Sequence, residues 1–155
     1  MAMFTVRTRD NYKYFKLVHG KRDLVLSWKK GKSKFPQELY EQLVKVVERY
    51  FCGFDILTVP APSFHDYGDN YPIWEIAKKV ARDTGMEAKV LFPEKSGKTR
   101  KHYTGWRQKK VQDIKLGPGF FVLVIDDIVT TGNTMGITFE AILRKGSYPC
   151  GLVIT

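Results

Sequence analysis

Apolar residues recur at helical spacing in three segments of the chain, residues 36–52, 72–84 and about 133–145. Each segment has one apolar helical face, which is the pattern of a helix that packs on a core. A proline opens the first two, and a glycine follows each, as expected at helix boundaries. The positions expected to face the core are Phe35, Leu39, Leu43, Val46, Val47 and Tyr50, then Ile73, Ile76, Ala77, Val80 and Ala81, and last Ile137, Ala141 and Ile142.

Short apolar runs alternate with these helices and predict strands at residues 55–59, 88–92, 120–125 and 150–154. Strands that alternate with helices indicate an α/β fold with a parallel sheet. The preceding residues 12–30 predict a β-hairpin, an N-terminal appendage with strands NYKYFKLV and DLVLSWKK and Gly20 in its turn.

The strongest chemical signal is VLVIDDIVTTGNT, residues 122–134. Its apolar run predicts a buried strand, so Asp126 and Asp127 fall at the carboxyl end of that strand, where α/β sheets bind ligands. The small polar residues that follow open a helix, whose free N–H groups suit an anion. One loop therefore offers carboxylates for hydroxyls or a hydrated metal, and a phosphate site. A ribose 5-phosphate needs both.

Two segments without apolar periodicity also reach this edge of the sheet. Residues 60–71 follow a strand, and their His65 is either a ligand, an acid/base group or simply exposed. Residues 93–118 are longer and rich in Lys and Arg, and a stretch of this kind inside a domain is typical of a mobile loop that closes over a site.

The charge of the chain is concentrated in two places. The net charge is +10, and residues 1–34 carry +8 while residues 94–115 carry +6. Two basic segments on an acidic body indicate a polyanionic ligand such as a pyrophosphate, a nucleotide or a nucleic acid, although a solubilising surface gives the same composition.

Length and composition limit the class of protein. The 155 residues, 43% of them hydrophobic, suit a single domain spanning residues 1–155. No apolar run approaches the length of a membrane span, and the N-terminal residues lack the apolar core of a signal peptide. Cys52 and Cys150 form no metal-binding spacing and are expected to be reduced, buried thiols. We therefore expect a cytoplasmic protein with no membrane partner.

Residues 122–134 resemble the motif that binds phosphoribosyl pyrophosphate (PRPP) in type I phosphoribosyltransferases. The resemblance implies that family's fold and a transfer of ribose 5-phosphate from PRPP to a nitrogenous acceptor, with release of pyrophosphate. Magnesium would be the cofactor, carried mainly by PRPP and within reach of Asp126 and Asp127. It implies that the ribose hydroxyls bind Asp126 and Asp127, and that the 5-phosphate binds Thr130, Thr131, Gly132, Asn133 and Thr134.

The basic loop has a role in the same comparison. In a phosphoribosyltransferase a mobile loop at this place closes over the reacting centre, excludes water and neutralises the departing pyrophosphate. The resemblance implies that the catalytic cations are Lys95, Lys98, Arg100 and Lys101.

Within that superfamily, residues 26–155 are most similar to the ComF (competence protein F) family. The similarity rests on LSWKKGKS, TVPAP, Gly68, Asn70 and a basic segment with Arg107. Several features depart from it. The cysteine-rich zinc module of that family is missing here, and Asp66 and Tyr67 stand where its loop carries arginines.

Other residues bear on the acceptor. Thr130 occupies the place of the base-directed Asp of hypoxanthine–guanine enzymes, which argues against 6-oxopurine salvage. No hood for the acceptor follows the last strand, so the N-terminal hairpin, the loops or a second subunit of a homodimer is expected to read it.

Two other functions stay open at this point. Tyr12, Tyr14 and Trp28 interleave with lysines, and Trp106 adjoins Arg107, so aromatic side chains could stack bases while cations hold phosphates. The same hairpin pattern also fits simple packing, which we favour because alternation alone is a weak signal of base stacking. The chain could therefore be a nucleic-acid-associated binding protein, or an interaction subunit that keeps the motif without turnover.

Overall fold

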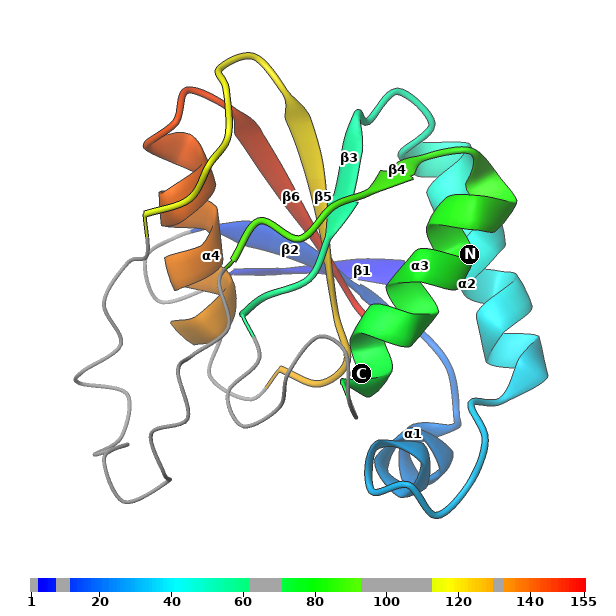
Figure 1. Ribbon diagram of the computed structural model, residues 1–155. Coiled ribbons are helices and arrows are strands. Elements are labelled where there is room, and N and C mark those ends of the chain that lie inside the picture. Colours follow the sequence, from blue (N-terminus) through cyan, green and yellow to red (C-terminus); the bar gives the residue numbers. More distant parts are fainter. Residues whose placement is uncertain (1–2, 8–11, 62–70, 93–112, 130–132) are drawn as a thin grey trace.

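The computed structural model describes residues 3–7, 12–61, 71–92, 113–129 and 133–155 (Figure 1). Four helices and six strands make up this part of the chain. The helices are α1 (Arg22–Lys29), α2 (Gln37–Tyr50), α3 (Pro72–Thr84) and α4 (Asn133–Leu143). The strands are β1 (Met3–Arg7), β2 (Lys13–Leu17), β3 (Ile56–Thr58), β4 (Glu87–Ala88), β5 (Phe121–Asp126) and β6 (Tyr148–Val153).

The strands form one sheet in the order β1-β2-β6-β5-β3-β4. All neighbouring strands are parallel except β1 and β2, which form an antiparallel hairpin. This confirms the α/β class, the mostly parallel sheet and an N-terminal hairpin. The hairpin is more than an appendage, because β2 pairs with β6 and places Phe15 beside Leu152.

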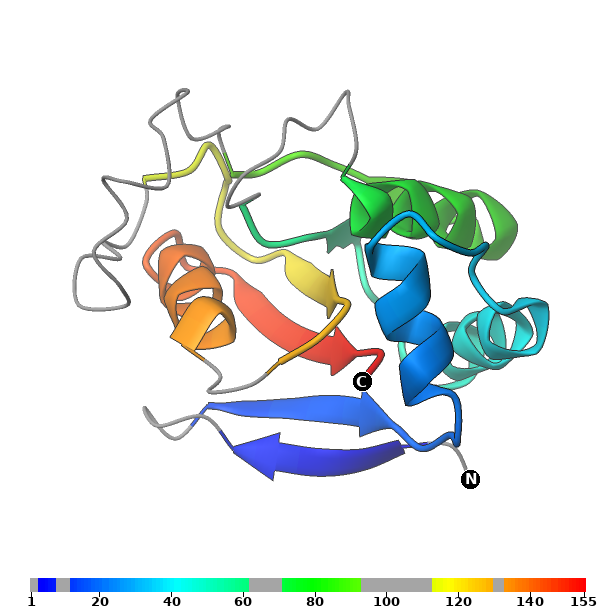
Figure 2. The ribbon, with the colours of Figure 1, turned by 90° about the horizontal axis from the view of Figure 1, so that it is seen from below.

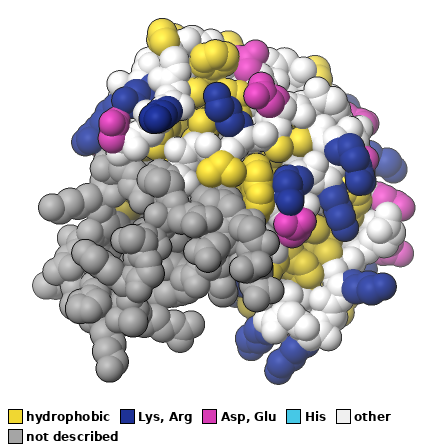
Figure 3. Space-filling model, viewed as in Figure 1, with side chains coloured by type: hydrophobic (Ala, Val, Ile, Leu, Met, Phe, Trp, Pro, Cys, Tyr) yellow, Lys and Arg dark blue, Asp and Glu magenta, His cyan; other side chains and the backbone are white. Residues whose placement is uncertain are grey.

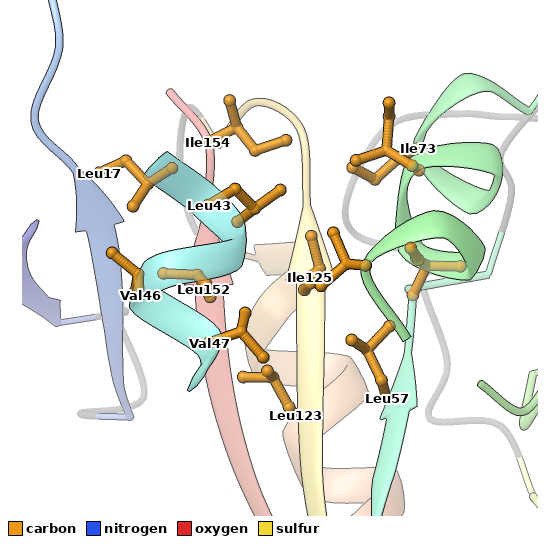
Figure 4. Close-up of a cluster of buried hydrophobic side chains, with 14 of the residues drawn as sticks. Leu17, Leu43, Val46, Val47, Leu57, Ile73, Leu123, Ile125, Leu152 and Ile154 are labelled. Atoms are coloured by element: carbon orange, nitrogen blue, oxygen red, sulfur yellow. The ribbon is translucent and has the colours of Figure 1, made fainter. Parts of the chain in front are cut away.

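Helices cover both faces of the sheet, with α1, α2 and α3 on one side and α4 on the other (Figures 1 and 2). The alternation of side chains along β5 follows this division. Leu123 and Ile125 face the α2 and α3 side, as Figure 4 shows, and Val122 and Val124 face α4. Strand β5 is buried on both faces, as its continuous apolar run predicted.

The predicted helices are confirmed with small changes at their ends. Pro72 is the first residue of α3, and Gly85 ends that helix with φ of 74°. Two of the expected core positions are wrong. Tyr50 is 43% exposed, and the next residue, Phe51, is buried in its place. Ile137 is half-buried, whereas Ala141 and Ile142 are buried as predicted and are joined in the core by Met135 and Phe139.

The thiols also differ from the expectation that both are buried, because Cys52 is exposed and Cys150 is half-buried.

The predicted hairpin over residues 12–30 is wrong in its second strand. Residues Arg22–Lys29 form helix α1, and the partner of β2 is the earlier segment β1. Val25 and Trp28 lie three residues apart and are both buried, while Leu24 is 47% exposed. A short apolar run fits a strand or a buried helix equally, and packing on the α2 and α3 side selects the helix here.

The predicted strand at residues 88–92 is also shorter than expected. Only Glu87–Ala88 pairs with β3, and one further hydrogen bond joins the Lys89 N–H to the Leu57 carbonyl. Leu91 and Phe92 are buried against the α4 side of the sheet without strand pairing. Their burial as core side chains explains the apolar run. Among the described residues, no helix has the length and hydropathy of a membrane span.

Gly151 on β6 packs closely against its surroundings, and its register partner on β2 is Tyr14. A Cβ there would lie 2.8 Å from Tyr14 Cβ and 2.9 Å from both Met135 Sδ and Phe139 Cζ. We expect Gly151→Ala to lower the free energy of unfolding by ~1–3 kcal/mol through overpacking. The measurement is urea denaturation, with Gly53→Ala as control because a Cβ at Gly53 meets nothing within 4 Å. Equal midpoints for the two variants would contradict this packing.

Candidate functional site

Strand β5 ends in two buried acids. Asp126 is its last residue and Asp127 follows it, and the two are 8% and 6% exposed. β5 lies between β6 and β3, parallel to both. The acids therefore sit at the carboxyl edge of a parallel sheet, as the sequence predicted.

Main-chain hydrogen bonds to the residues after β6 hold the two acids in place. The N–H of Ile154 donates to the Asp126 carbonyl at 3.0 Å, and the N–H of Thr155 donates to the Asp127 carbonyl at 2.9 Å. The Val129 N–H then donates to the Thr155 carbonyl at 3.2 Å. The parallel pairing thus continues past both strands and fixes the backbone of the acidic turn.

Each acid side chain also accepts a hydrogen bond from the next backbone N–H. Asp126 Oδ1 accepts from the Asp127 N–H at 2.8 Å, and Asp127 Oδ1 accepts from the Ile128 N–H at 2.6 Å. These turns orient both carboxylates without using all of their acceptor positions. As far as the described residues go, the other lone pairs of these carboxylates can accept from hydroxyl donors or bind a hydrated cation.

The environment of Asp126 disfavours its charge. Burial, followed by the negative charge of Asp127, raises the pKa of the Asp126 carboxyl well above its usual range, and Lys29 partly opposes the shift. Two adjacent carboxylates in a buried turn resist simultaneous ionisation. A cation or hydroxyl donors at this place would relieve that repulsion.

Helix α4 begins shortly after the acids. Asn133 and Thr134 lie in its first turn, as predicted, and the Thr134 carbonyl accepts a hydrogen bond from Thr138 Oγ1 at 2.7 Å. The first turn of α4 carries no acidic residue, so no side-chain carboxylate there competes with an anion. Thr130, Thr131 and Gly132 lie outside the described residues.

The structure also brings Lys29 to this site, which the sequence reasoning missed. Lys29 Nζ lies 3.5 Å from Asp127 Oδ1, across 98 positions of the chain. Its lysine-rich surroundings in LSWKKGKS gave no signal that singled it out, and the strand assigned there was wrong. The predicted catalytic cations Lys95, Lys98, Arg100 and Lys101, together with His65, Trp106 and Arg107, lie outside the described residues.

A separate cleft of about 970 Å³ lies along α2 and α3. Its lining mixes aromatic and charged side chains, including the Tyr40 hydroxyl that donates to Asp83 at 2.5 Å. No residue of β5 or α4 lines it, so the acid pair belongs to a different surface.

The raised pKa of Asp126 predicts a pH-dependent stability. The folded protein binds a proton at Asp126 more readily than the unfolded chain does. The stability that this proton contributes is therefore complete below the unfolded pKa of about 3.9 and is lost as pH rises through the folded pKa of Asp126. Asn mimics the protonated acid. We expect Asp126→Asn to gain stability relative to the native chain as pH rises above about 4, with a gain that grows until the pH passes the folded pKa of Asp126.

Denaturant unfolding at several pH values measures this difference. Asp23→Asn is the control, because Asp23 is exposed on α1 and loses the same charge. A stability difference that stays constant with pH, or that falls, would contradict the buried pair.

Comparisons with solved structures address the fold. Hypoxanthine phosphoribosyltransferase from Staphylococcus aureus is similar with a TM-score of 0.50 and 14% identity, over 76% of this chain and 60% of that chain. Adenine phosphoribosyltransferase from Saccharomyces cerevisiae, solved with an imino-altritol bisphosphate and adenine, gives 0.47 and 13%, over 99% of this chain and 84% of that one. Another adenine phosphoribosyltransferase gives 0.47 and 12%, over 99% and 85%.

No protein-family model and no curated protein matches the sequence. At 12–14% identity, the likeness to these solved structures concerns the fold alone. The similarity to the Staphylococcus aureus enzyme and the mostly parallel sheet show that the chain has the fold of the type I phosphoribosyltransferases.

Proposed function

We propose that this protein is a phosphoribosyltransferase that moves ribose 5-phosphate from PRPP to a nitrogenous base or a related acceptor. One observation carries the proposal. Two adjacent buried acids, Asp126 and Asp127, end the strand β5, and the acid-free first turn of α4 follows a few residues later. In a fold shared with known phosphoribosyltransferases, this pairing matches the needs of a sugar phosphate.

The acid pair and the start of α4 would bind different parts of the ligand. Carboxylates accept hydrogen bonds from the 2- and 3-hydroxyls of the ribose, and charge-assisted bonds of this kind are strong. The N–H groups at the start of α4, with Thr130 to Thr134, would hold the 5-phosphate. Because Asp126 and Asp127 are fixed by backbone bonds to the chain beyond β6, the ribose would bind in one orientation.

Magnesium fits this donor set in a limited way. The described residues contain no group of three or more His, Cys, Asp or Glu side chains that could enclose a metal ion. Mg²⁺ keeps several waters and is commonly bound through substrate phosphates and one or two carboxylates. PRPP would carry the ion, with Asp126 and Asp127 as its protein partners, and the ion would neutralise the leaving pyrophosphate.

The reaction replaces one bond at C1 of the ribose with another. The bond from C1 to the pyrophosphate oxygen breaks, a nitrogen of the acceptor bonds to C1, and that nitrogen loses its proton. Positive charge develops on the ribose as negative charge grows on the leaving group. Lys95, Lys98, Arg100 and Lys101, within the basic segment 93–118, are the cations proposed to stabilise that departure.

The finer assignment is a cytoplasmic enzyme similar to the ComF family, whose acceptor stays unnamed. Thr130 supports an acceptor other than a 6-oxopurine, because it stands where hypoxanthine–guanine enzymes carry the Asp directed at the base. In a homodimer, the second subunit would contribute to the surface that reads the acceptor.

The nucleic-acid alternative receives less support from the described residues. Tyr14 and Trp28 are buried at 5% and 9% exposure, so they pack in the core and do not stack on bases. On the face drawn in Figure 3, the Lys and Arg side chains of described residues are scattered and interleaved with acids. A nucleic-acid role would require affinity that falls steeply with salt.

The direct test is PRPP binding. With Mg²⁺ present, we expect Asp127→Asn to raise the Kd for PRPP on the order of 100-fold, because charge-assisted hydrogen bonds to the ribose are weakened. Isothermal titration calorimetry measures the Kd, and thermal melting confirms that the variant folds. A release of pyrophosphate in a screen of nitrogenous bases would then identify the acceptor.

Asp55→Asn is the matched control. Asp55 precedes β3 at the opposite edge of the sheet, where its Oδ2 accepts the Phe121 N–H at 2.8 Å, and Asn keeps that acceptor. We expect this control to bind PRPP as the native chain does. If the native chain does not bind PRPP, or if Asp127→Asn binds it equally well, the proposed site is wrong.

A further inference from the structure

Helix α1 is fixed against the core by its buried face. Val25 is fully buried, and Trp28 is 9% exposed and packs edge-to-face on Phe35 with ring centroids 4.9 Å apart. Both belong to the cluster shared with α2 and α3. Lys29 directly follows Trp28, so the anchored indole determines where the lysine stem leaves the helix.

A second contact ties the start of α1 to the acidic turn. His19 Nδ1 accepts the Lys21 N–H at 3.0 Å, which leaves the proton on Nε2 to donate to the Ile154 carbonyl at 2.6 Å. The N–H of the same Ile154 donates to the Asp126 carbonyl. Ile154 therefore binds both the segment before α1, through its carbonyl, and the acidic turn, through its N–H.

The ammonium group of Lys29 lies at the outer side of Asp127. Its distance of 3.5 Å to Oδ1 is long for an ion pair, and the lysine side chain is 48% exposed while that of Asp127 is 8% exposed. Asp127 Oδ1 already accepts the Ile128 N–H at 2.6 Å. A ribose hydroxyl that donates to this oxygen would take the position that Lys29 holds.

The chemistry of PRPP supplies the next partner for the displaced ammonium. C1, which carries the diphosphate, is bonded directly to C2, which carries a hydroxyl held by the acids. A cation that leaves Asp127 thus lies beside the diphosphate. Lysine is a compact charge on a flexible stem and suits such a transfer.

We infer that Lys29 is a further PRPP-binding residue, which pairs with Asp127 in the free protein and moves to the diphosphate when the ribose hydroxyls bind Asp127. This inference rests on the proposed function of the site. It assigns to the N-terminal segment, through α1, a direct part in recognising the diphosphate end of the substrate. It also predicts that Lys29 discriminates PRPP from a ribose phosphate without a diphosphate.

The experiment compares two ligands and two neighbouring lysines. Lys29→Met keeps the length of the side chain and removes its charge, and Lys30→Met makes the same change at the next, exposed position. We expect Lys29→Met to raise the Kd for Mg²⁺–PRPP about tenfold or more, because a charge-assisted contact is lost. Its Kd for ribose 5-phosphate should stay equal to the native value or fall, since the lysine no longer competes for Asp127.

Each outcome decides the question. Lys30→Met should bind both ligands as the native chain does, and Lys29→Arg should recover most of the PRPP affinity. If Lys29→Met binds PRPP normally, or weakens both ligands equally, the assignment of Lys29 is wrong while the proposed function stands. If the native chain fails to bind PRPP, both the proposed function and this assignment are overturned.

Discussion

The site depends on the hydrogen bonds between the end of β5 and the chain beyond β6. The N–H groups of Ile154 and Thr155 hold the carbonyls of Asp126 and Asp127, and Val129 returns a bond to Thr155. Two adjacent acids would be better solvated by water than by a protein interior. The extended parallel pairing nevertheless holds them in the buried turn. The position of the two carboxylates is therefore determined by hydrogen bonds to the chain after β6 and not by the solvation of the acids.

In the free protein, this arrangement leaves the negative charge of the acidic turn poorly neutralised. The raised pKa of Asp126 expresses the conflict between burial and the neighbouring charge of Asp127. Lys29 gives Asp127 a long and half-exposed ion pair, which screens part of that charge. A ligand that brings hydroxyl donors and a hydrated cation removes the same conflict more completely. Local destabilisation of this kind is typical of functional sites, where the surrounding structure maintains it.

The sequence predicted the elements with long or unambiguous patterns. Helices α2 and α3, which have 14 and 13 residues, follow from their apolar faces, and β5 with its two acids follows from an apolar run that ends in charge. It failed at α1, where a short apolar run within eight residues fits either a strand or a helix. It also failed at β4, where Leu91 and Phe92 are apolar because they fill the core rather than because they pair. Local pattern cannot separate these cases, since tertiary packing decides them.

The position of Lys29 could not follow from local pattern at all. It is one of several lysines between residues 29 and 34, and its selection depends on Trp28, whose burial holds α1 against the core. The N-terminal segment is joined to this region at three places: β2 pairs with β6, His19 binds the carbonyl of Ile154 just after β6, and Lys29 contacts Asp127 in the acidic turn. A segment with these connections cannot move independently of the acidic turn. The N-terminal region is therefore structurally part of the site, and variation in it would act on the geometry of Asp126 and Asp127 even without contact to the ligand.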